Sequence, residues 1–116
     1  MSTVYYQPEA FDLTIVGEID FNEEAYQFDF RIFWQDQAGK IYTARDSGCS
    51  CPTPFEDYHG VNDLAQVELC DINALRNEVA DDIRPGSGDS LGGAMETLRS
   101  IESLLSPTLG SWIFTP

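Results

Sequence analysis

The chain has 116 residues, of which twenty are acidic and six are basic, so its formal net charge at pH 7 is −14. This length fits one domain with a single core, and the apolar content of 42% excludes a disordered chain. The charge argues against nucleic acid and anionic membranes as partners, because both are polyanions. We therefore expect a single domain over residues 1–116 that attracts a protein with a basic surface.

The sequence carries no signal for membrane insertion or export. No apolar run reaches the roughly 18–20 residues that a bilayer crossing needs. The first residues lack the basic start and apolar centre of a signal peptide. We expect a cytoplasmic protein with reduced cysteines, and the odd number of cysteines argues against a disulfide framework.

The first half of the chain alternates apolar and polar residues, which is typical of strands. Residues 11–20 predict a strand with Phe11, Leu13 and Ile15 directed inward. Gly17 interrupts the alternation and is expected to mark a β-bulge.

Residues 25–35 give the clearest strand. Their inward face is predicted to hold every second residue, with Phe33 as the exception to the alternation: Tyr26, Phe28, Phe30, Ile32 and Trp34. A turn at residues 36–39 and a third strand at residues 40–45 follow. The short connections predict an antiparallel meander over about residues 11–46.

The second half changes to helical spacing, and two or three helices are expected over about residues 62–106. The first is a short helix through Leu64 and Val67. Its expected cap is Asn62 or Asp63, because these side chains accept hydrogen bonds from free backbone N–H groups.

Two longer helices follow. One begins after Asp71 and ends at Pro85, with Ile72, Leu75, Val79 and Ile83 at helical spacing. Residues 86–89 read as a flexible linker. The last helix is capped by Asp89 or Ser90, and its apolar stripe consists of Leu91, Met95, Leu98, Ile101 and Leu105.

The order of strands and then helices predicts an α+β fold. We expect an antiparallel three- or four-stranded meander followed by two or three helices packed on one face. Residues 107–116 form a tail, in which residues 112–114 add an edge strand or dock on the core.

The segment from residue 46 to residue 58, the cysteine loop, is the densest candidate site. It contains two cysteines one residue apart, two prolines and an acidic pair. A zinc site is one interpretation, although its spacing is tighter than usual, with Cys49, Cys51, His59 and Cys70 as the ligands. The competing interpretation is that small residues pack the loop under the helices, with no cofactor.

A thiol enzyme is a further alternative, with Cys49 or Cys51 as the nucleophile. Such a nucleophile needs a base or a cation that favours the thiolate. His59 is the only histidine, and the neighbouring Glu56 and Asp57 disfavour a negative sulfur. The sequence therefore favours a protein that is not an enzyme.

The acidic residues are unevenly distributed. Residues 1–30 contain seven acids and no Lys or Arg, and residues 46–75 contain six acids and no Lys or Arg. If these segments meet in the fold, they form a continuous negative surface that steers a basic partner; the alternative role of the charge is solubility alone. The candidate partner-binding residues are Glu18, Asp20, Glu23, Glu24, Glu56, Asp57 and Tyr58.

Three short segments carry a family resemblance: Trp34-Gln35-Asp36, Gly39-Lys40-Ile41-Tyr42 and the loop from Asp46 to Glu56. With them the first half of the chain resembles small uncharacterised proteins of actinobacterial bacteriophages. The resemblance implies a phage protein made in the host cytoplasm and implies no catalytic residues.

The leading hypothesis is a non-enzymatic acidic phage accessory protein that binds a host protein, in one form by mimicking the charge of a nucleic acid. The first alternative is a structural or assembly module held by a metal, and the second is the thiol enzyme. A homodimer is compatible with each of them.

Overall fold

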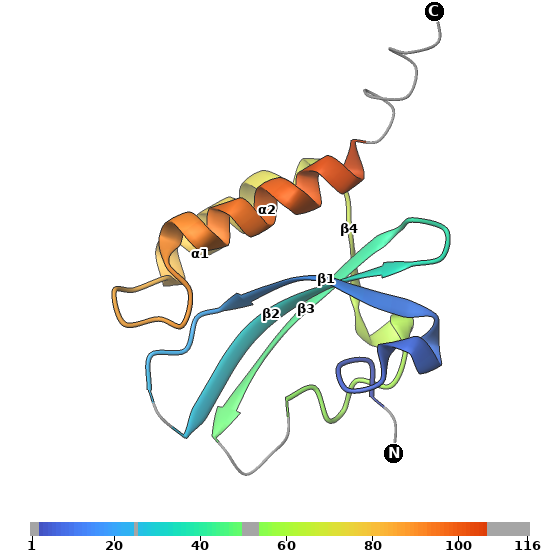
Figure 1. Ribbon diagram of the computed structural model, residues 1–116, viewed down its shortest axis with the longest axis horizontal. Helices are drawn as coiled ribbons and strands as arrows, with labels where there is room; N and C mark the ends of the chain where they lie inside the picture. The colour runs from blue at the N-terminus through green and yellow to red at the C-terminus, as the bar shows by residue number, and fades with distance from the viewer. Residues whose placement is uncertain (1–2, 25, 50–53, 107–116) are drawn as a thin grey trace, which may run out of the picture.

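The computed structural model describes residues 3–24, 26–49 and 54–106, and its sheet is an antiparallel meander (Figure 1). The strand order β1-β2-β3-β4 follows the chain. The strands are β1 (Leu13–Asp20), β2 (Gln27–Asp36), β3 (Ile41–Cys49) and β4 (Ala65–Val67). The helices are α1 (Ile72–Asp82) and α2 (Leu91–Leu105). This arrangement confirms the α+β prediction.

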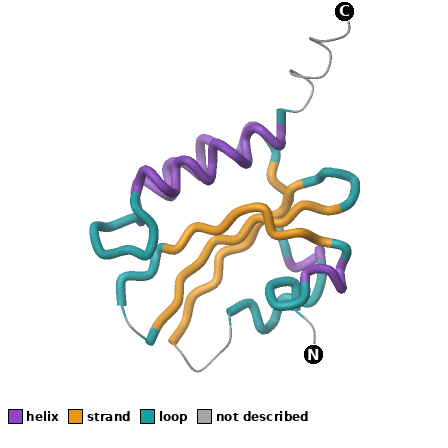
Figure 2. Tube along the Cα trace, viewed as in Figure 1, coloured by secondary structure: helices purple, strands orange, loops and turns teal. Residues whose placement is uncertain are grey.

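Both faces of the sheet are covered, and by different parts of the chain. The two helices lie along one side of the sheet, and the N-terminal segment and the loop after β3 lie along the other (Figures 1 and 2). Each side has its own core. We call the side under the helices the helix face and the opposite side the aromatic face.

The alternation along β2 assigns its residues to these two cores. Ile32 and Trp34 belong to the core of the aromatic face, whereas Phe33 is fully buried in the core of the helix face. Phe33, the exception in the alternation, is therefore the residue on which the helices pack. The helices pack on one face as expected, but not on the face that holds most of the aromatic residues.

A β-bulge in β1 moves the apolar residues of this strand from one face to the other. The pairing register shifts between Ile15 and Gly17, which confirms the bulge expected there. Leu13 and Ile15 pack on the aromatic face, and Ile19 packs under the helices. A Cβ atom at Gly17 would lie 3.1 Å from a Thr97 methyl group, so glycine allows α2 to approach closely.

Helix α2 begins as the sequence predicts. Ser90 is its N-cap, and the Ser90 Oγ accepts a hydrogen bond from the Gly93 N–H at 3.0 Å. The buried stripe differs in one place, because Ala94 is fully buried whereas Leu91 is 49% exposed. The buried stripe therefore begins at Ala94, about one helical turn after Leu91.

The expected short helix at residues 62–67 is wrong. The chain forms a 3-10 helix, η2 (Val61–Asp63), and then β4, which pairs with the first residues of β3. Of this segment only Val67 is buried, in the core under the helices. Pairing with β3 therefore overrides the local helical signal.

The expected flexible linker at residues 86–89 is also wrong. The Gly88 N–H donates to the Asn22 carbonyl at 2.9 Å, and the Ser87 Oγ donates to the Phe21 carbonyl at 3.1 Å. A Cβ atom at Gly88 would lie 2.0 Å from the Asp20 Oδ2. The segment is thus a closely packed loop that requires glycine at position 88.

Tyr26 differs from its expected inward position. It precedes β2, has a φ angle of +64° and is 83% exposed. The predictions for Cys51 and for residues 107–116 lie outside the described residues.

Candidate functional site

The centre of the aromatic face is a cluster of rings from three parts of the chain. The Tyr5 ring lies 5.3 Å from the Phe55 ring, and the Phe55 ring lies 5.1 Å from the Tyr58 ring. Trp34 of β2 packs edge-on against Phe55 at 5.6 Å. Tyr6 extends the cluster outward and is 55% exposed. We call these five residues the aromatic cluster.

Backbone hydrogen bonds hold the cluster together. The Trp34 Nε1–H donates to the Val4 carbonyl at 2.8 Å, and the Val4 N–H donates to the Tyr58 carbonyl at 3.0 Å. The Phe55 N–H donates to the Asp46 carboxylate at 2.7 Å. Phe55 has a φ angle of +60°, which is costly for a residue with a Cβ atom. Burial of its ring and these bonds hold it in this conformation.

Carboxylates flank the aromatic cluster at both of its ends. Burial raises the pKa of Tyr5, and the negative charges of Glu18 and Asp20 raise it further. Burial also raises the pKa of Tyr58, together with the charges of Asp46, Asp63 and Asp57. Tyr5 and Tyr58 both contact Phe55. The carboxylates near Tyr5 and those near Tyr58 are therefore neighbours of the same set of rings.

Glu18 is a carboxylate on β1, near the aromatic cluster. Burial raises its pKa above the ordinary value, and the charges of Asp20 and Asp89 act in the same direction. The repulsion shows that three carboxylates from β1 and from the α1–α2 loop lie close together. An incoming cation would relieve it.

Most of the positive charge of the protein lies on the helix face of the sheet and on the helices. The Arg45 guanidinium on β3 forms two bonds to Asp29, at 2.8 and 2.9 Å, and one to Asp82 of α1 at 2.7 Å. It also lies 3.8 Å from the centre of the Phe21 ring. The Arg31 guanidinium similarly binds Glu78 of α1, at 2.5 and 2.7 Å.

The other arginines lie on the helices or directly after α1. Arg76 pairs with Glu102 and so joins α1 to α2, while Arg99 pairs with Glu96 within α2. Arg84 follows α1 and donates to the Asp81 carbonyl. The segments that carry Tyr5, Tyr6, Phe55 and Tyr58, in contrast, lie within residues 1–30 and 46–75, which contain no Lys or Arg.

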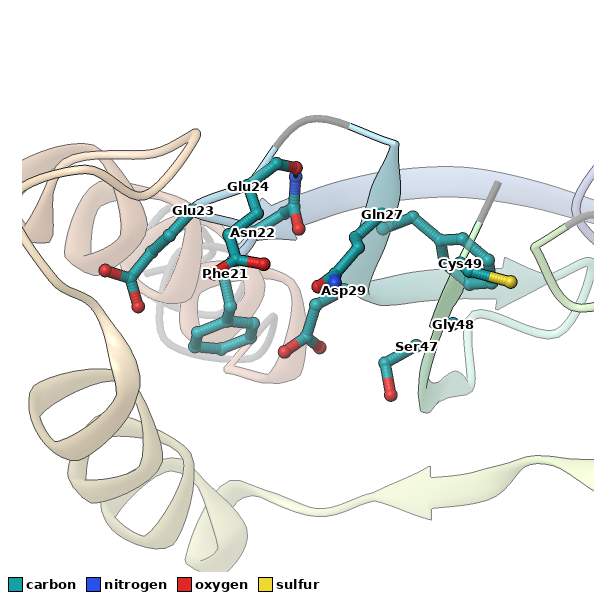
Figure 3. A pocket seen from close by; sticks show the side chains of 10 residues that line it. Phe21, Asn22, Glu23, Glu24, Gln27, Asp29, Ser47, Gly48 and Cys49 are labelled. Atoms are coloured by element: carbon teal, nitrogen blue, oxygen red, sulfur yellow. Dashed lines mark hydrogen bonds between the residues drawn. The ribbon is translucent and has the colours of Figure 1, made fainter. Parts of the chain in front are cut away.

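A second acidic region lies on the helix face, beyond the ends of the helices. It is a cleft of about 540 Å³ whose lining includes Glu23, Glu24, Asp29, Ser47 and Cys49. Glu23 and Cys49 lie on opposite sides of this cleft (Figure 3). All the charged residues that line it are acidic, so its described lining offers no cation to stabilise a thiolate.

The structure separates the predicted partner-binding residues into two groups. Glu18, Asp20, Asp57 and Tyr58 lie around the aromatic cluster. Glu56 is exposed on the same loop, directly after Phe55. Glu23 and Glu24 form the second group and line the cleft on the other side of the sheet.

The predicted metal ligands are distributed over distant parts of the fold. Cys49 ends β3 and pairs with Gln27, whereas Cys70 follows β4, whose Val67 pairs with Ile41 at the start of β3. The step of eight residues from Ile41 to Cys49 spans about 26 Å along β3. One ion therefore cannot contact both thiols. The prediction then reduces to Cys49 and Cys51, and Cys51 lies outside the described residues.

His59 directly follows Tyr58 of the aromatic cluster. It is exposed, and its backbone N–H donates to the Asp63 carboxylate at 2.9 Å. Among the described residues, no three His, Cys, Asp or Glu side chains are grouped so that they could hold a metal ion.

Several residues of the site were not among the predicted binding residues: Tyr5, Tyr6, Trp34, Phe55, Asp46, Asp63 and Asp89. Tyr5 and Asp89 are brought to the cluster and to Glu18 by tertiary contacts. Asp46 carried a usable signal, because it lies on the same face of β3 as Tyr42 and Ala44, both of which pack in the core of the aromatic face.

A family model described as Domain of unknown function (DUF7574) matches residues 2–107. The chain belongs to this family. The match includes the whole sheet, both helices and all residues of the aromatic cluster. No curated protein and no solved structure matches the chain. Among the described helices of this family member, none has the length and apolarity needed to cross a bilayer.

Proposed function

We propose that this protein is a non-enzymatic binding protein that captures a basic surface of another protein through its aromatic face. In the context implied by its resemblance to actinobacterial phage proteins, it is a phage accessory protein that acts on a host protein in the host cytoplasm. The single observation that carries the proposal is that carboxylates adjoin the aromatic cluster: Asp46 accepts a hydrogen bond from the Phe55 N–H at 2.7 Å, and Glu56 and Asp57 are exposed directly after Phe55.

The chemistry of this face suits cationic side chains. The rings of Tyr5, Tyr6 and Tyr58 offer electron-rich faces, and a Lys or Arg side chain over such a ring gains a cation–π interaction. Burial raises the pKa of the neighbouring Glu18, and the charges of Asp20 and Asp89 add to this effect. A bound cation would lower this repulsion, so binding and local electrostatics favour the same partner.

The aromatic and acidic residues have different roles in this proposal. Partly exposed rings at the centre of an interface contribute most of the affinity, whereas charges at the rim mainly raise the association rate. We therefore expect Tyr6→Ala to weaken binding more than Glu56→Gln does. Salt should weaken binding strongly, because it screens exposed charges.

The experiment is affinity capture from a host lysate at low and high salt, with two variants of equal charge change. Glu56→Gln/Asp57→Asn neutralises two carboxylates beside the aromatic cluster. Asp81→Asn/Glu96→Gln neutralises two carboxylates on the helices and is the control. We expect the first variant to lose the captured protein and the second to retain it.

Three results would contradict the proposal: equal loss with both variants, capture that salt does not affect, or a captured protein without a basic surface. The first would mean that only total charge matters. A captured protein that normally binds DNA or RNA would support the more specific form of the proposal, in which the carboxylates mimic the charge of a nucleic acid. In that form, duplex DNA should compete with the protein for the captured partner.

A further inference from the structure

The two edges of the sheet differ in how their outward backbone groups are hydrogen-bonded. At the β1 edge, the Asp20 N–H donates to the Asp89 carboxylate at 2.7 Å, and the Asp89 N–H donates to the Asp20 carbonyl at 2.9 Å. The α1–α2 loop thus occupies the outward backbone groups at the end of β1. Among the described residues, none forms comparable backbone hydrogen bonds to the second half of the β3 edge.

The hydrogen-bond pattern of the β2–β3 ladder defines which backbone groups of β3 point outward. The Asp36 N–H donates to the Lys40 carbonyl at 3.0 Å, so these two residues form a hydrogen-bonded pair at the β2–β3 turn. Such pairs recur at every second residue in an antiparallel ladder. Asp46 and Gly48 therefore bond to β2, and the backbone groups of Arg45 and Ser47 point away from it.

Strand β4 covers only the first part of this outward edge. It pairs with Ile41, Tyr42 and Thr43 and then ends. Within the described part of the chain, the outward N–H and C=O groups of Arg45 and Ser47 have no hydrogen-bond partner. An unpaired row of this kind is a template for an added strand.

We propose that the β3 edge at Arg45–Ser47 adds an extended basic segment of the partner protein as a further strand of the sheet. The inference rests on the proposed function and specifies how the partner binds. In this mode main-chain hydrogen bonds provide affinity, and alternate side chains of the added strand provide specificity.

The surroundings of the edge favour a basic occupant. Ser47 is exposed and lines the acidic cleft, so side chains on that face of the added strand point toward a cleft whose charged lining residues are all acidic. The alternate side chains point to the aromatic face, where Asp46 and Tyr58 lie. A second copy of the chain is disfavoured as the occupant, because it carries the same net charge of −14 and would be repelled.

The test uses two short peptides of alternating lysine and threonine. One has an ordinary backbone, and in the other every backbone N–H is methylated, which preserves the charge but removes all main-chain donors. We expect the methylated peptide to bind the unmodified protein about tenfold more weakly at the same salt concentration, because backbone hydrogen bonds are lost.

Two protein variants test the edge itself. Ser47→Pro removes the outward N–H at a position where an edge strand tolerates proline, and Ser47→Ala retains this group. We expect Ser47→Pro to weaken binding of the ordinary peptide about tenfold and Ser47→Ala to leave it unchanged. Hydrogen exchange provides a readout in the unmodified protein: the peptide should slow exchange at the Arg45 and Ser47 amides, which are otherwise unprotected.

The outcomes separate the two proposals. Equal affinity for both peptides, with unchanged exchange at Ser47, overturns the edge inference and leaves electrostatic capture by the aromatic face standing. Failure of both peptides to bind at low salt counts against the edge inference and against the proposed basic partner. A dimer of the unmodified protein that Ser47→Pro converts to a monomer would show that the occupant is a second copy, contrary to the inference.

Discussion

Asp20 and Asp89 are joined by two hydrogen bonds although both side chains are acidic. The Asp20 N–H donates to the Asp89 Oδ2 at 2.7 Å, and the Asp89 N–H donates to the Asp20 carbonyl at 2.9 Å. The pair closes the β1 edge and fixes the loop that leads into α2. It also places two negative charges near Glu18, which raises the pKa of that residue beyond the effect of burial.

Replacing Asp89 separates its hydrogen bond from its charge. Asp89→Ala leaves the Asp20 N–H without its acceptor, and we expect the free energy of unfolding to fall by about 1–2 kcal/mol. Asp89→Asn retains an acceptor oxygen and removes a repulsive charge, so we expect a change within about 0.5 kcal/mol. Urea unfolding measures both. If the asparagine variant is as unstable as the alanine variant, the bond is not the main contribution.

Two glycines near the start of α2 should respond to alanine in opposite directions. At Gly88 an added Cβ atom meets the Asp20 side chain at 2.0 Å, which forces the loop away from β1. We expect a loss of about 1–3 kcal/mol, as for other overpacked sites.

Gly92 provides the control for this prediction. It lies in the first turn of α2, and an added Cβ atom there meets nothing within 4 Å. Gly92→Ala should stabilise the protein by about 0.5 kcal/mol, because alanine loses less backbone entropy in a helix. Thermal unfolding of the two variants would reveal the contrast, and a stable Gly88→Ala protein would contradict the tight packing.

The Arg45 ion pairs should be sensitive to replacement by lysine. Lysine retains the positive charge but loses the planar group that binds both oxygens of Asp29, and it reaches Asp82 less well. Because the Arg45 side chain is only 24% exposed, we expect a loss of about 1–3 kcal/mol.

Arg99 is the matched exposed arginine. Its side chain is 66% exposed and pairs with Glu96 within the same helix. Arg99→Lys should change stability by less than about 0.5 kcal/mol, because exposed ion pairs contribute little. Equal effects of the two substitutions in urea unfolding would show that the contacts of Arg45 between β3 and α1 have no special importance.

Stability should fall as the pH rises through the raised pKa of Glu18. Burial and the charges of Asp20 and Asp89 make the folded protein hold this proton more tightly than the unfolded chain does. The free energy of unfolding then decreases between the ordinary carboxyl range and the raised pKa of the folded state.

The Glu18→Gln variant tests this pH dependence. The substitution removes the titrating group, so the variant should lose less stability than the unmodified protein between about pH 4.5 and 7. Glu9→Gln changes the net charge equally at an exposed position and serves as the control. Parallel pH profiles for the unmodified protein and Glu18→Gln would rule out this role for Glu18.

Local patterns in the sequence were sufficient for the first three strands and for the two main helices, but not for β4. The alternation from Phe28 to Trp34 requires an extended chain, because only a strand sends successive side chains to opposite faces. Ser90 before an apolar stripe marks a helix start, because its Oγ satisfies a free N–H. The excess of acids over bases is likewise a property of the sequence alone.

Tertiary structure decided what covers each face and which charges meet. Alternation defines two faces of β2 but does not say that Phe33 packs under helices while Trp34 packs against Phe55. The loop at residues 86–89 appeared flexible because its partners on β1 lie more than sixty positions away. The repulsion between carboxylates depends on their distance in space. Only the folded chain brings Asp89 to Glu18 and leaves the outward groups of Ser47 without a partner among the described residues.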